Sequence, residues 1–359
     1  MHLRDFPGRS TAIDLGSATV RVHVAGRGIV AAEPAALARC TETGRVLAIG
    51  RAAVDLAERR RGVRLVRPVR GGVPAEPDDT EAILRRLLRH HHRSRYLARP
   101  RMAITAPSLL TPLQREAVCE AAFRAGARKL TVVPKPLAAA LGAGLPGPGS
   151  DTAVVADIGA HVTDVGLITF GGLAGSATAP VGGADLDRAI VSFVRTEHRL
   201  HISAAAAERV KTELGALAPR GRRRAQQILV HGRDVRTGLP RAEVLAADDV
   251  HAAIAAPVDA IVEAVTSGLA SCSPDMAAEL VSGGLTLTGG TAALRGLDRR
   301  VHEATGLPVR VAADPADAAV KGAAAMLALG GASPDPDVRS GRRGSLLPSP
   351  PQPWPVRSL

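Results

Sequence analysis

Two stretches of the sequence combine an aspartate with a glycine two residues later, at Asp14-x-Gly16 and Asp157-x-Gly159. The glycine permits a tight turn and lets backbone N–H groups approach an anion closely. The aspartate can hold Mg²⁺ through water molecules. One such pair would mean little, because turns use aspartate and glycine constantly. Two copies in similar surroundings predict a phosphate site shared by two matching hairpins.

The segments around both pairs read as strand, turn and strand. An apolar run at Ala12–Leu15 and alternating residues at Val20–Val24 predict a hairpin around the first glycine. Residues 151–171 repeat the pattern, which predicts two related domains that face each other, each offering one hairpin. Side-chain hydroxyl groups close to the turns would add contacts to a phosphate; they belong to Ser17, Thr19 and Thr163.

A third candidate is the Thr-Gly-Gly-Thr turn at 288–291, which follows an apolar run and precedes an expected helix. A glycine turn at the start of a helix suits close backbone approach to a nucleotide. Two phosphate hairpins and one adenosine turn together describe the actin-type ATPase fold, an α/β architecture.

Lys135 lies between two prolines, just before the alanine-rich segment Leu137–Leu141. That segment favours a helix, and Pro136 suits its first position. Lys135 is therefore expected at about the N-cap, where a cation faces the positive end of the helix dipole at a cost of about 0.3–1 kcal/mol. Either Lys135 points into solvent, or an anion in the cleft offsets this cost.

Composition places the chain among globular proteins. It has 359 residues, of which 46% are apolar, enough for a large core and two domains. Its three cysteines are widely separated and predict free thiols in a reducing compartment. We find no run of about 20 apolar residues and no signal peptide at the N-terminus, so we expect a cytoplasmic protein without a transmembrane helix.

The net charge of +12 raises the question of a nucleic-acid partner. Aromatic residues are only 2% of the chain, and no helix-turn-helix or zinc signature occurs, so no specific nucleic-acid partner is expected. Basic runs at 85–101 and 218–227 favour a solvated face or a contact with anionic lipid. The segment from 331 to 359 is rich in proline, serine, glycine and arginine, which predicts a disordered tail.

Longer motifs make the resemblance to a known family specific. They include IDLGSAT, PLQREAVCEAAFRAGARKL, AERVKTELG, LTGGTAALRGLD and DAAVKGAA, and they follow the family's order and spacing. From Thr11 to Leu329 the sequence resembles MreB, the bacterial actin homologue that maintains rod shape. The resemblance implies two facing lobes, each with a smaller inserted subdomain. The implied boundaries are 1–36, 72–150 and 315–330 for the first lobe core, 37–71 for its small subdomain, 151–184 and 249–314 for the second lobe core, 185–248 for its small subdomain, and 331–359 for the tail.

The resemblance also implies where a nucleotide would bind. The phosphates would lie against Asp14, Gly16, Ser17, Ala18, Thr19, Asp157, Gly159, Ala160, His161 and Thr163. Ribose and adenine would meet Glu208, Lys211, Gly289, Gly290 and Thr291. Without the resemblance, Glu208 and Lys211 would be interpreted as an ordinary surface ion pair. The cofactor would be ATP or GTP with Mg²⁺, which Asp14 and Asp157 would hold through water.

Departures from the family pattern concern the same cleft. Lys135 stands where relatives have the glutamate that resembles the water-positioning carboxylate of the actin superfamily. In the second phosphate loop, Ala160, His161 and Val162 replace Gly-Gly-Thr. A Cβ or an imidazole then lies where backbone should meet phosphate, and His161 would either contact phosphate as a cation or plug the loop. We therefore expect weak nucleotide binding and little or no hydrolysis, with no confident catalytic residue.

The function implied by the resemblance is a membrane-associated filament involved in cell shape and wall synthesis. Its partners would be further copies of itself, the inner face of the cell membrane and the wall-synthesis machinery, with the apolar pair Tyr96-Leu97 touching lipid. The alternative is a non-hydrolysing actin-fold scaffold or regulator that acts beside an active paralogue. A different actin-fold ATPase, such as a plasmid-segregation filament or a chaperone, is disfavoured by the unbroken order of the motifs.

Overall fold

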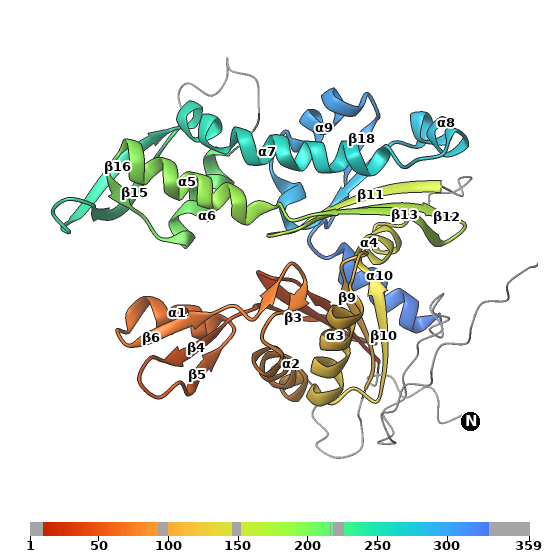
Figure 1. The fold of residues 1–359 in the computed structure, drawn as a ribbon, viewed down its shortest axis with the longest axis horizontal. Helices are drawn as coiled ribbons and strands as arrows, with labels where there is room; N and C mark the ends of the chain where they lie inside the picture. The colour runs from red at the N-terminus through yellow and green to blue at the C-terminus, as the bar shows by residue number, and fades with distance from the viewer. Residues whose placement is uncertain (1–9, 92–99, 146–151, 216, 218–225, 330–359) are drawn as a thin grey trace, which may run out of the picture.

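The computed structural model describes residues 10–91, 100–145, 152–215, 217 and 226–329. The chain forms two lobes that lie one above the other in Figure 1, with two helices between them. Tyr96, Leu97 and the tail at 331–359 lie outside the described residues.

A five-stranded sheet forms the centre of the first lobe. Its order is β10-β9-β1-β2-β3, with β1 parallel to β9 and antiparallel to β2. The bounds are β1 Ser10–Leu15, β2 Thr19–Val24, β3 Gly28–Pro34, β9 Arg101–Ala106 and β10 Lys129–Pro134. The expected hairpin around the first Asp-x-Gly pair is therefore confirmed by the pairing of β1 with β2.

Helices cover both faces of this sheet. Helices α2 (Pro77–His91) and α3 (Pro112–Ala125) pack on one face, and α10 (Ala318–Ala328) packs on the other. Local sequence sets the ends of α3: Thr111 and Gln114 form a capping box, and Gly126 ends the helix in the left-handed conformation at φ 119°.

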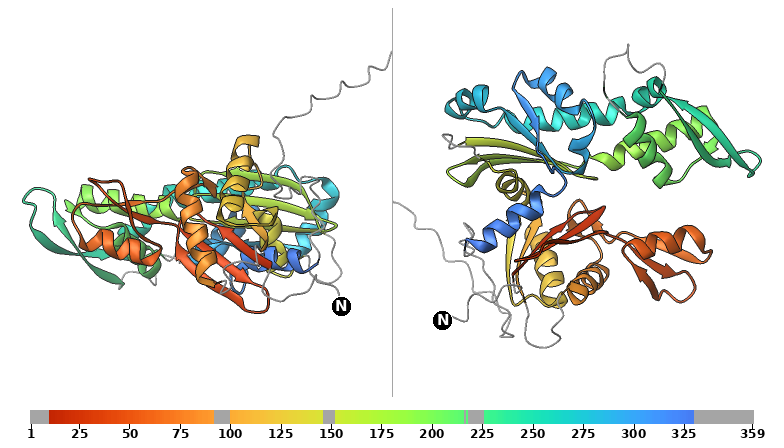
Figure 2. Two further views of the ribbon diagram at one scale, coloured as in Figure 1. Left: turned by 90° about the horizontal axis from the view of Figure 1, so that it is seen from below. Right: turned by 180° about the vertical axis from the view of Figure 1, so that it is seen from behind.

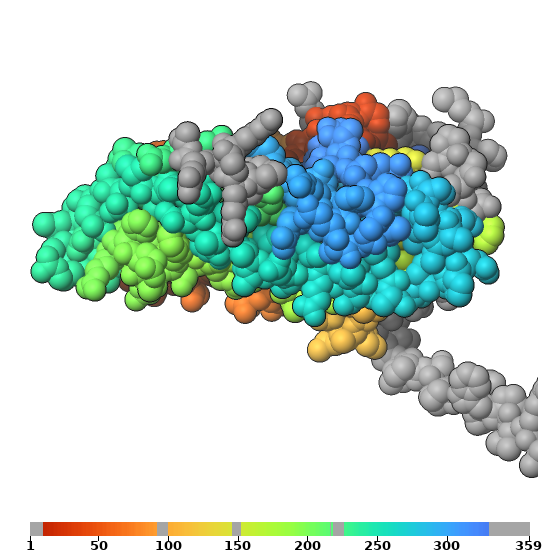
Figure 3. All heavy atoms as spheres, turned by 90° about the horizontal axis from the view of Figure 1, so that it is seen from above, coloured from red at the N-terminus to blue at the C-terminus, as the bar shows by residue number. Residues whose placement is uncertain are grey.

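The second lobe repeats this plan. Its sheet has the order β13-β12-β11-β17-β18, with β11 parallel to β17 and antiparallel to β12. The bounds are β11 Thr152–Ile158, β12 Thr163–Thr169, β13 Gly172–Ala179, β17 Leu285–Thr288 and β18 Val309–Val311. Helices α7 (Ala247–Leu269), α8 (Pro274–Gly283) and α9 (Leu297–Thr305) gather over its outer side, which Figure 3 shows from above.

Helix α7 changes one expectation drawn from the sequence. By length and composition it could cross a membrane, although we expected no apolar run of that length. Buried residues such as Ile254, Ile261 and Val265 join the core of the second lobe, where α7 packs on β12, β13 and α5. One face of α7 therefore belongs to the core of the lobe, although only 33% of its most apolar 18-residue window is buried.

Each lobe carries a smaller extension, and both project from the same end of the molecule (Figures 1 and 2). The first contains a sheet of order β5-β4-β6 with α1, followed by the short pair β7–β8. Their bounds are β4 Leu37–Cys40, β5 Val46–Ile49, α1 Arg51–Arg59, β6 Val63–Val66, β7 Val69–Arg70 and β8 Val73–Pro74. The second contains β14 Leu200–His201, β15 Gln227–Asp234 and β16 Pro240–Ala246, with α5 Gly183–Glu197 and α6 Ala204–Leu214.

Two helices join the lobes. Helix α4 (Lys135–Gly142) follows β10 of the first lobe but packs on β11 and β12 of the second, while α10 packs on the first sheet. The two helices cross at Gly142 and Gly322. A Cβ on Gly142 would lie 1.8 Å from the Ala318 carbonyl oxygen, and one on Gly322 would lie 1.7 Å from that of Ala138. Only glycine permits this backbone contact.

Two local expectations need correction. Lys135 is the first residue of α4, and Pro134 takes the N-cap position that was expected for the lysine. The 288–291 turn opens a four-residue 3₁₀ helix, Gly290–Ala293, and the longer α9 begins only at Leu297. Glycines explain this break, because Gly289 and Gly296 both have φ 86°, outside the helical region.

Candidate functional site

Lys135 lies between the two predicted hairpins. Its Nζ atom is 3.3 Å from Oδ1 of Asp14 and 3.3 Å from Oδ2 of Asp157. The aspartates are the next-to-last residues of β1 and β11, and each is only 2% exposed. The structure therefore brings Lys135 together with two residues of the predicted phosphate site. From the sequence, this lysine was expected either to point into solvent or to face an anion.

Two threonines hold the aspartates in place, and they do so in the same way in both lobes. Thr105 Oγ1 donates a hydrogen bond to Asp14 Oδ1 at 2.7 Å, and Thr288 Oγ1 donates to Asp157 Oδ1 at 3.1 Å. Each threonine is the register partner of its aspartate on the adjacent parallel strand. Sequence reasoning missed Thr105, and only the strand register of the repeat could have indicated it.

The charges of this cluster stabilise one another. Burial lowers the pKa of Lys135, but the nearby carboxylates of Asp14 and Asp157 raise it further, so its pKa is well above the usual range and the ammonium stays protonated. Burial raises the pKa of Asp157, against the opposing effect of the lysine. Arg21 adds a second cation, 3.9 Å from Asp14 and 3.0 Å from Asp317.

The first hairpin has the geometry of an anion-binding turn. A Cβ on Gly16 would lie 2.5 Å from the Thr19 carbonyl oxygen, so the turn requires glycine. The N–H groups of Ser17 and Ala18 have no hydrogen-bond acceptor in the described part of the chain. The Ser17 hydroxyl accepts a hydrogen bond from the Gly72 N–H at 3.0 Å.

The second hairpin is closed by a backbone hydrogen bond and is held by the side chain of Thr291. The Gly159 N–H donates to the Val162 carbonyl at 2.8 Å, and the Gly159 carbonyl accepts from Thr291 Oγ1 at 2.8 Å. The Thr163 hydroxyl donates to the Val181 carbonyl, so this hydroxyl is not available at the turn as the sequence had suggested. As at the equivalent positions of the first hairpin, the N–H groups at 160 and 161 have no acceptor among the described residues.

His161 stands at the tip of the second hairpin. It is partly buried, and its Nδ1 atom has no hydrogen-bond partner among the described residues. Burial lowers its pKa below the usual 6.5 against the opposing charge of Asp185, and Arg188 and Arg67 act in the same direction as burial. The imidazole is therefore neutral at pH 7, which favours the plug over the cation of our two sequence interpretations.

The predicted adenosine residues converge only in part. Lys211 Nζ donates to the Gly183 carbonyl at 3.2 Å and lies 2.9 Å from Asp187 Oδ1. A Cβ on Gly183 would lie 2.5 Å from Thr291 Oγ1, so the lysine and this threonine meet at the start of α5. Glu208 is exposed on α6. Sequence reasoning missed Asp187, which pairs with Lys211.

Gly289 and Gly290 differ in their surroundings. A Cβ on Gly289 would lie 2.4 Å from the Ile158 carbonyl oxygen, so this glycine lets the 288–291 turn pack against the second hairpin. A Cβ on Gly290 would meet nothing within 4 Å.

A second polar contact joins the two lobes. Ser108, which follows β9 in the first lobe, donates to Asp164 on β12 through its backbone N–H at 2.9 Å and through its hydroxyl at 2.5 Å. Thr178 donates to the same carboxylate at 2.8 Å. Burial raises the pKa of Asp164 despite these three donors.

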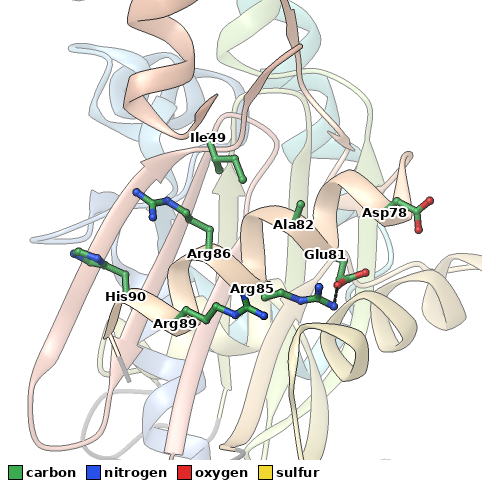
Figure 4. Close-up of a pocket in the computed structure, with 8 residues that line it drawn as sticks. All are labelled: Ile49, Asp78, Glu81, Ala82, Arg85, Arg86, Arg89 and His90. Carbon is green, nitrogen blue, oxygen red and sulfur yellow. Dashed lines mark ion pairs between the residues drawn. The ribbon is translucent and has the colours of Figure 1, made fainter. Parts of the chain in front are cut away.

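A separate cavity of about 560 Å³ lies between α2 and β5, away from the hairpins (Figure 4). It is lined by Ile49, Asp78, Glu81, Ala82, Arg85, Arg86, Arg89 and His90. An ion pair between Glu81 and Arg85 crosses one side of it. None of the residues predicted for the nucleotide site contributes to its lining.

Comparison with solved structures defines the class of protein. MreB5 of Spiroplasma citri bound to AMPPNP superposes with a TM-score of 0.82 at 26% identity, covering 89% of this chain and 96% of that one. The MamK double helical filament superposes with a TM-score of 0.74 at 17% identity over 89% and 99% of the two chains. The fold is therefore actin-like, as the motifs predicted.

Sequence comparison defines the family. Residues 8–331 match the family described as MreB/Mbl protein. The cell shape-determining protein MreB of Escherichia coli (strain K12) is 36% identical over 317 residues, which are 87% of this chain and 91% of that protein. The cell shape-determining protein Mbl of Bacillus subtilis is 33% identical over 320 residues, or 89% and 96%. This chain belongs to the MreB/Mbl family.

Proposed function

We propose that this chain is a filament-forming cytoskeletal protein that acts in cell shape and wall synthesis, binds a nucleotide between its lobes, and hydrolyses it very slowly. Membership of a cell shape-determining family supports the first part. The cytoplasm, next to the inner face of the membrane, is the location that fits this role. The domain boundaries given above are part of the same proposal.

Nucleotide binding is supported by the two hairpins. Each offers backbone N–H groups at the third and fourth residues after its aspartate that have no acceptor among the described residues, which suits the oxygens of a phosphate chain. Lys211, Gly183 and Thr291 lie together beside the second hairpin, where ribose and base would follow. Structures of the related MreB5 contain AMPPNP and ADP. ATP or GTP is therefore the proposed ligand.

Slow hydrolysis is supported by one observation above all, the position of Lys135 between Asp14 and Asp157. A protonated lysine at the start of α4 cannot accept a proton from an attacking water. Loss of general-base assistance typically lowers a rate by about 10²–10⁴-fold. Ala160 and His161 add side chains to a loop whose backbone should meet phosphate.

Single-turnover hydrolysis of ATP tests the catalytic part. The natural protein should hydrolyse near the background rate. Lys135→Glu alone should remain slow, whereas Lys135→Glu combined with Ala160→Gly, His161→Gly and Val162→Thr should be faster. A natural protein that turns over as fast as this combined variant would contradict the proposal.

Sedimentation of purified protein with and without ATP tests the filament. Pelleting above a critical concentration supports a filament-forming protein. The second candidate is a scaffold that neither hydrolyses nor polymerises, and the Lys135 bridge favours it because the cation that joins the lobes belongs to the protein itself. A protein that stays in the supernatant at every concentration and in both conditions would support the scaffold.

A further inference from the structure

The contact between the two lobes contains a cation of the protein's own, the ammonium of Lys135. Lys135 Nζ is equidistant, at 3.3 Å, from one carboxylate of each lobe. The lysine side chain is 19% exposed and those of the aspartates are 3% exposed, so all three charges are largely removed from water. Buried charges are tolerated when they are paired and hydrogen-bonded, and both aspartates also receive a threonine hydroxyl.

The arrangement does not fit a divalent cation shared by these two aspartates. Mg²⁺ requires near-octahedral oxygen ligands and keeps several waters. Here the Lys135 ammonium lies between the carboxylates that would hold those waters, and a second positive charge at that place would be repelled. The two aspartates named from the sequence as the Mg²⁺ site are already neutralised in part by Lys135, and Arg21 lies beside Asp14.

Without a cation, closure of the lobes would bring two carboxylates together. An oxygen of each carboxylate lies 3.3 Å from Lys135 Nζ, so without the ammonium two like charges would face each other at short range and repel. Other contacts keep the lobes near each other at this depth: Ser108 binds Asp164, and a Cβ on Gly71 would lie 3.4 Å from Val162. The closed arrangement therefore needs a positive charge between the aspartates.

We propose that the Lys135 ammonium takes the place of a divalent cation between Asp14 and Asp157 and clasps the two lobes together, so that closure needs neither Mg²⁺ nor nucleotide. The lysine reaches both carboxylates because α4 begins at the end of a first-lobe strand and packs on the second-lobe sheet. The residues of this clasp, Lys135, Asp14 and Asp157, belong to the proposed nucleotide site. The clasp itself acts in the protein without ligand.

The test uses the full chain without nucleotide, at concentrations where it does not pellet. Lys135→Met removes the charge and keeps a similar length. Lys321→Met is the matched control, since Lys321 pairs with Asp314 on the surface at 2.5 Å. Radius of gyration by small-angle scattering and thermal midpoint are measured in EDTA and in Mg²⁺, and Mn²⁺ binding is followed by electron paramagnetic resonance.

We expect the natural protein and the Lys321→Met variant to show the same radius and midpoint in both solutions and no saturable Mn²⁺ site. Lys135→Met should be more expanded and melt lower in EDTA, and should recover both values in Mg²⁺ while binding one Mn²⁺ per chain. A saturable Mn²⁺ site in the natural protein that Mg²⁺ competes for would overturn the proposal. So would a Lys135→Met variant as compact and as stable in EDTA as the natural protein.

A double variant covers the case in which Lys135→Met does not fold. Lys135→Met with Asp157→Asn removes one charge of each sign, so it should be compact and insensitive to Mg²⁺. If the double variant requires Mg²⁺ for compaction, Lys135 is not the clasp. Titration of ATP in EDTA is a separate arm: failure to bind ATP would contradict the proposed nucleotide site and leave the result on the clasp standing.

Discussion

Lys135 owes its position to the two carboxylates that face it. A cation in the first turn of a helix meets the positive end of the helix dipole, an unfavourable contact of about 0.3–1 kcal/mol. Asp14 and Asp157 more than offset this contact, because two opposite charges lie 3.3 Å away in a buried site. The question raised by a lysine between two prolines is thus answered by residues far from it in the sequence.

The threonines behind the aspartates provide the first prediction. Thr105→Val removes a hydrogen bond to a buried carboxylate, and such bonds contribute about 1.5–3 kcal/mol. We expect the free energy of unfolding, measured by urea denaturation, to fall by about 2 kcal/mol, and Thr288→Val to behave similarly.

Thr237→Val is the control, because Thr237 is exposed in the β15–β16 turn and bonds the carboxylate of Asp234, which also accepts two backbone N–H groups. It should change stability by no more than about 0.5 kcal/mol. If Thr105→Val and Thr237→Val change the free energy of unfolding equally, the hydrogen bond from Thr105 to Asp14 contributes no more to stability than the bond in the β15–β16 turn.

His161 provides a prediction on pH dependence. Its pKa is lowered in the folded protein, chiefly by burial, so the unfolded chain takes up a proton more readily. The free energy of unfolding therefore decreases as the pH falls through 6.5 toward the lowered pKa, because the unfolded chain binds the proton of His161 first. His161→Asn removes this loss, so the variant should gain stability relative to the natural protein between pH 7.5 and 5.5, by urea denaturation at each pH.

His231→Asn serves as the control, since His231 is exposed on β15. A His161→Asn variant whose stability runs parallel to that of the natural protein across this range would show that the imidazole is not buried as described.

At the scale of elements, the crossing of α4 and α10 is the main covalent and packed connection between the lobes. Each helix packs on a different sheet, and they touch backbone to backbone at two glycines. Because a glycine inside a helix costs about 1 kcal/mol relative to alanine, the gain must come from this close approach. The crossing holds α4 between the two lobes, and Lys135 is the first residue of this helix.

Gly322→Ala tests the crossing. The added Cβ would lie 1.7 Å from the Ala138 carbonyl oxygen, so the helices must move apart. Overpacking of this kind costs about 1–3 kcal/mol or more, and we expect a loss at or above the upper end. The thermal midpoint and the urea midpoint should both fall.

Gly283→Ala is the matched change, at the end of α8, where a Cβ would meet nothing within 4 Å. It should leave the midpoints unchanged or raise them slightly, because alanine favours the helix. A Gly322→Ala variant as stable as Gly283→Ala would mean that the helices are not in contact as described.

At the scale of the whole molecule, the net charge of +12 favours association with anionic surfaces. We predict that the protein binds vesicles of anionic phospholipid through residues 93–101, which combine Tyr96-Leu97 with four arginines. Each arginine near an anionic surface contributes about 1 kcal/mol. Co-sedimentation with vesicles should fall when Tyr96→Ser and Leu97→Ser are combined, and should also fall as salt rises.

The control replaces another apolar pair, Val235→Ser with Leu239→Ser, which is exposed at the β15–β16 turn. Vesicle binding should be unaffected by this change. If the 96–97 variant binds vesicles as well as the natural protein does, the anchor lies elsewhere in the chain.

The sequence by itself determined the local elements and the family. The Asp-x-Gly pairs, their flanking apolar runs and the glycine turn at 288–291 are short-range patterns, so they predicted the hairpins and the actin-like fold. The lysine at the start of α4 was equally visible, since proline and alanine mark the helix there. These features depend on residues within a few positions of one another, which is why they can be read without a structure.

Only the tertiary structure decided what the lysine binds. Positions 14, 135 and 157 come from three elements, and they meet because α4 leaves one sheet and packs on the other. The role of Thr105 depends on strand register, and the bond between Ser108 and Asp164 depends on how closely the lobes approach. Side-chain partners across a cleft are set by packing between distant segments, and no local pattern in the sequence encodes that distance.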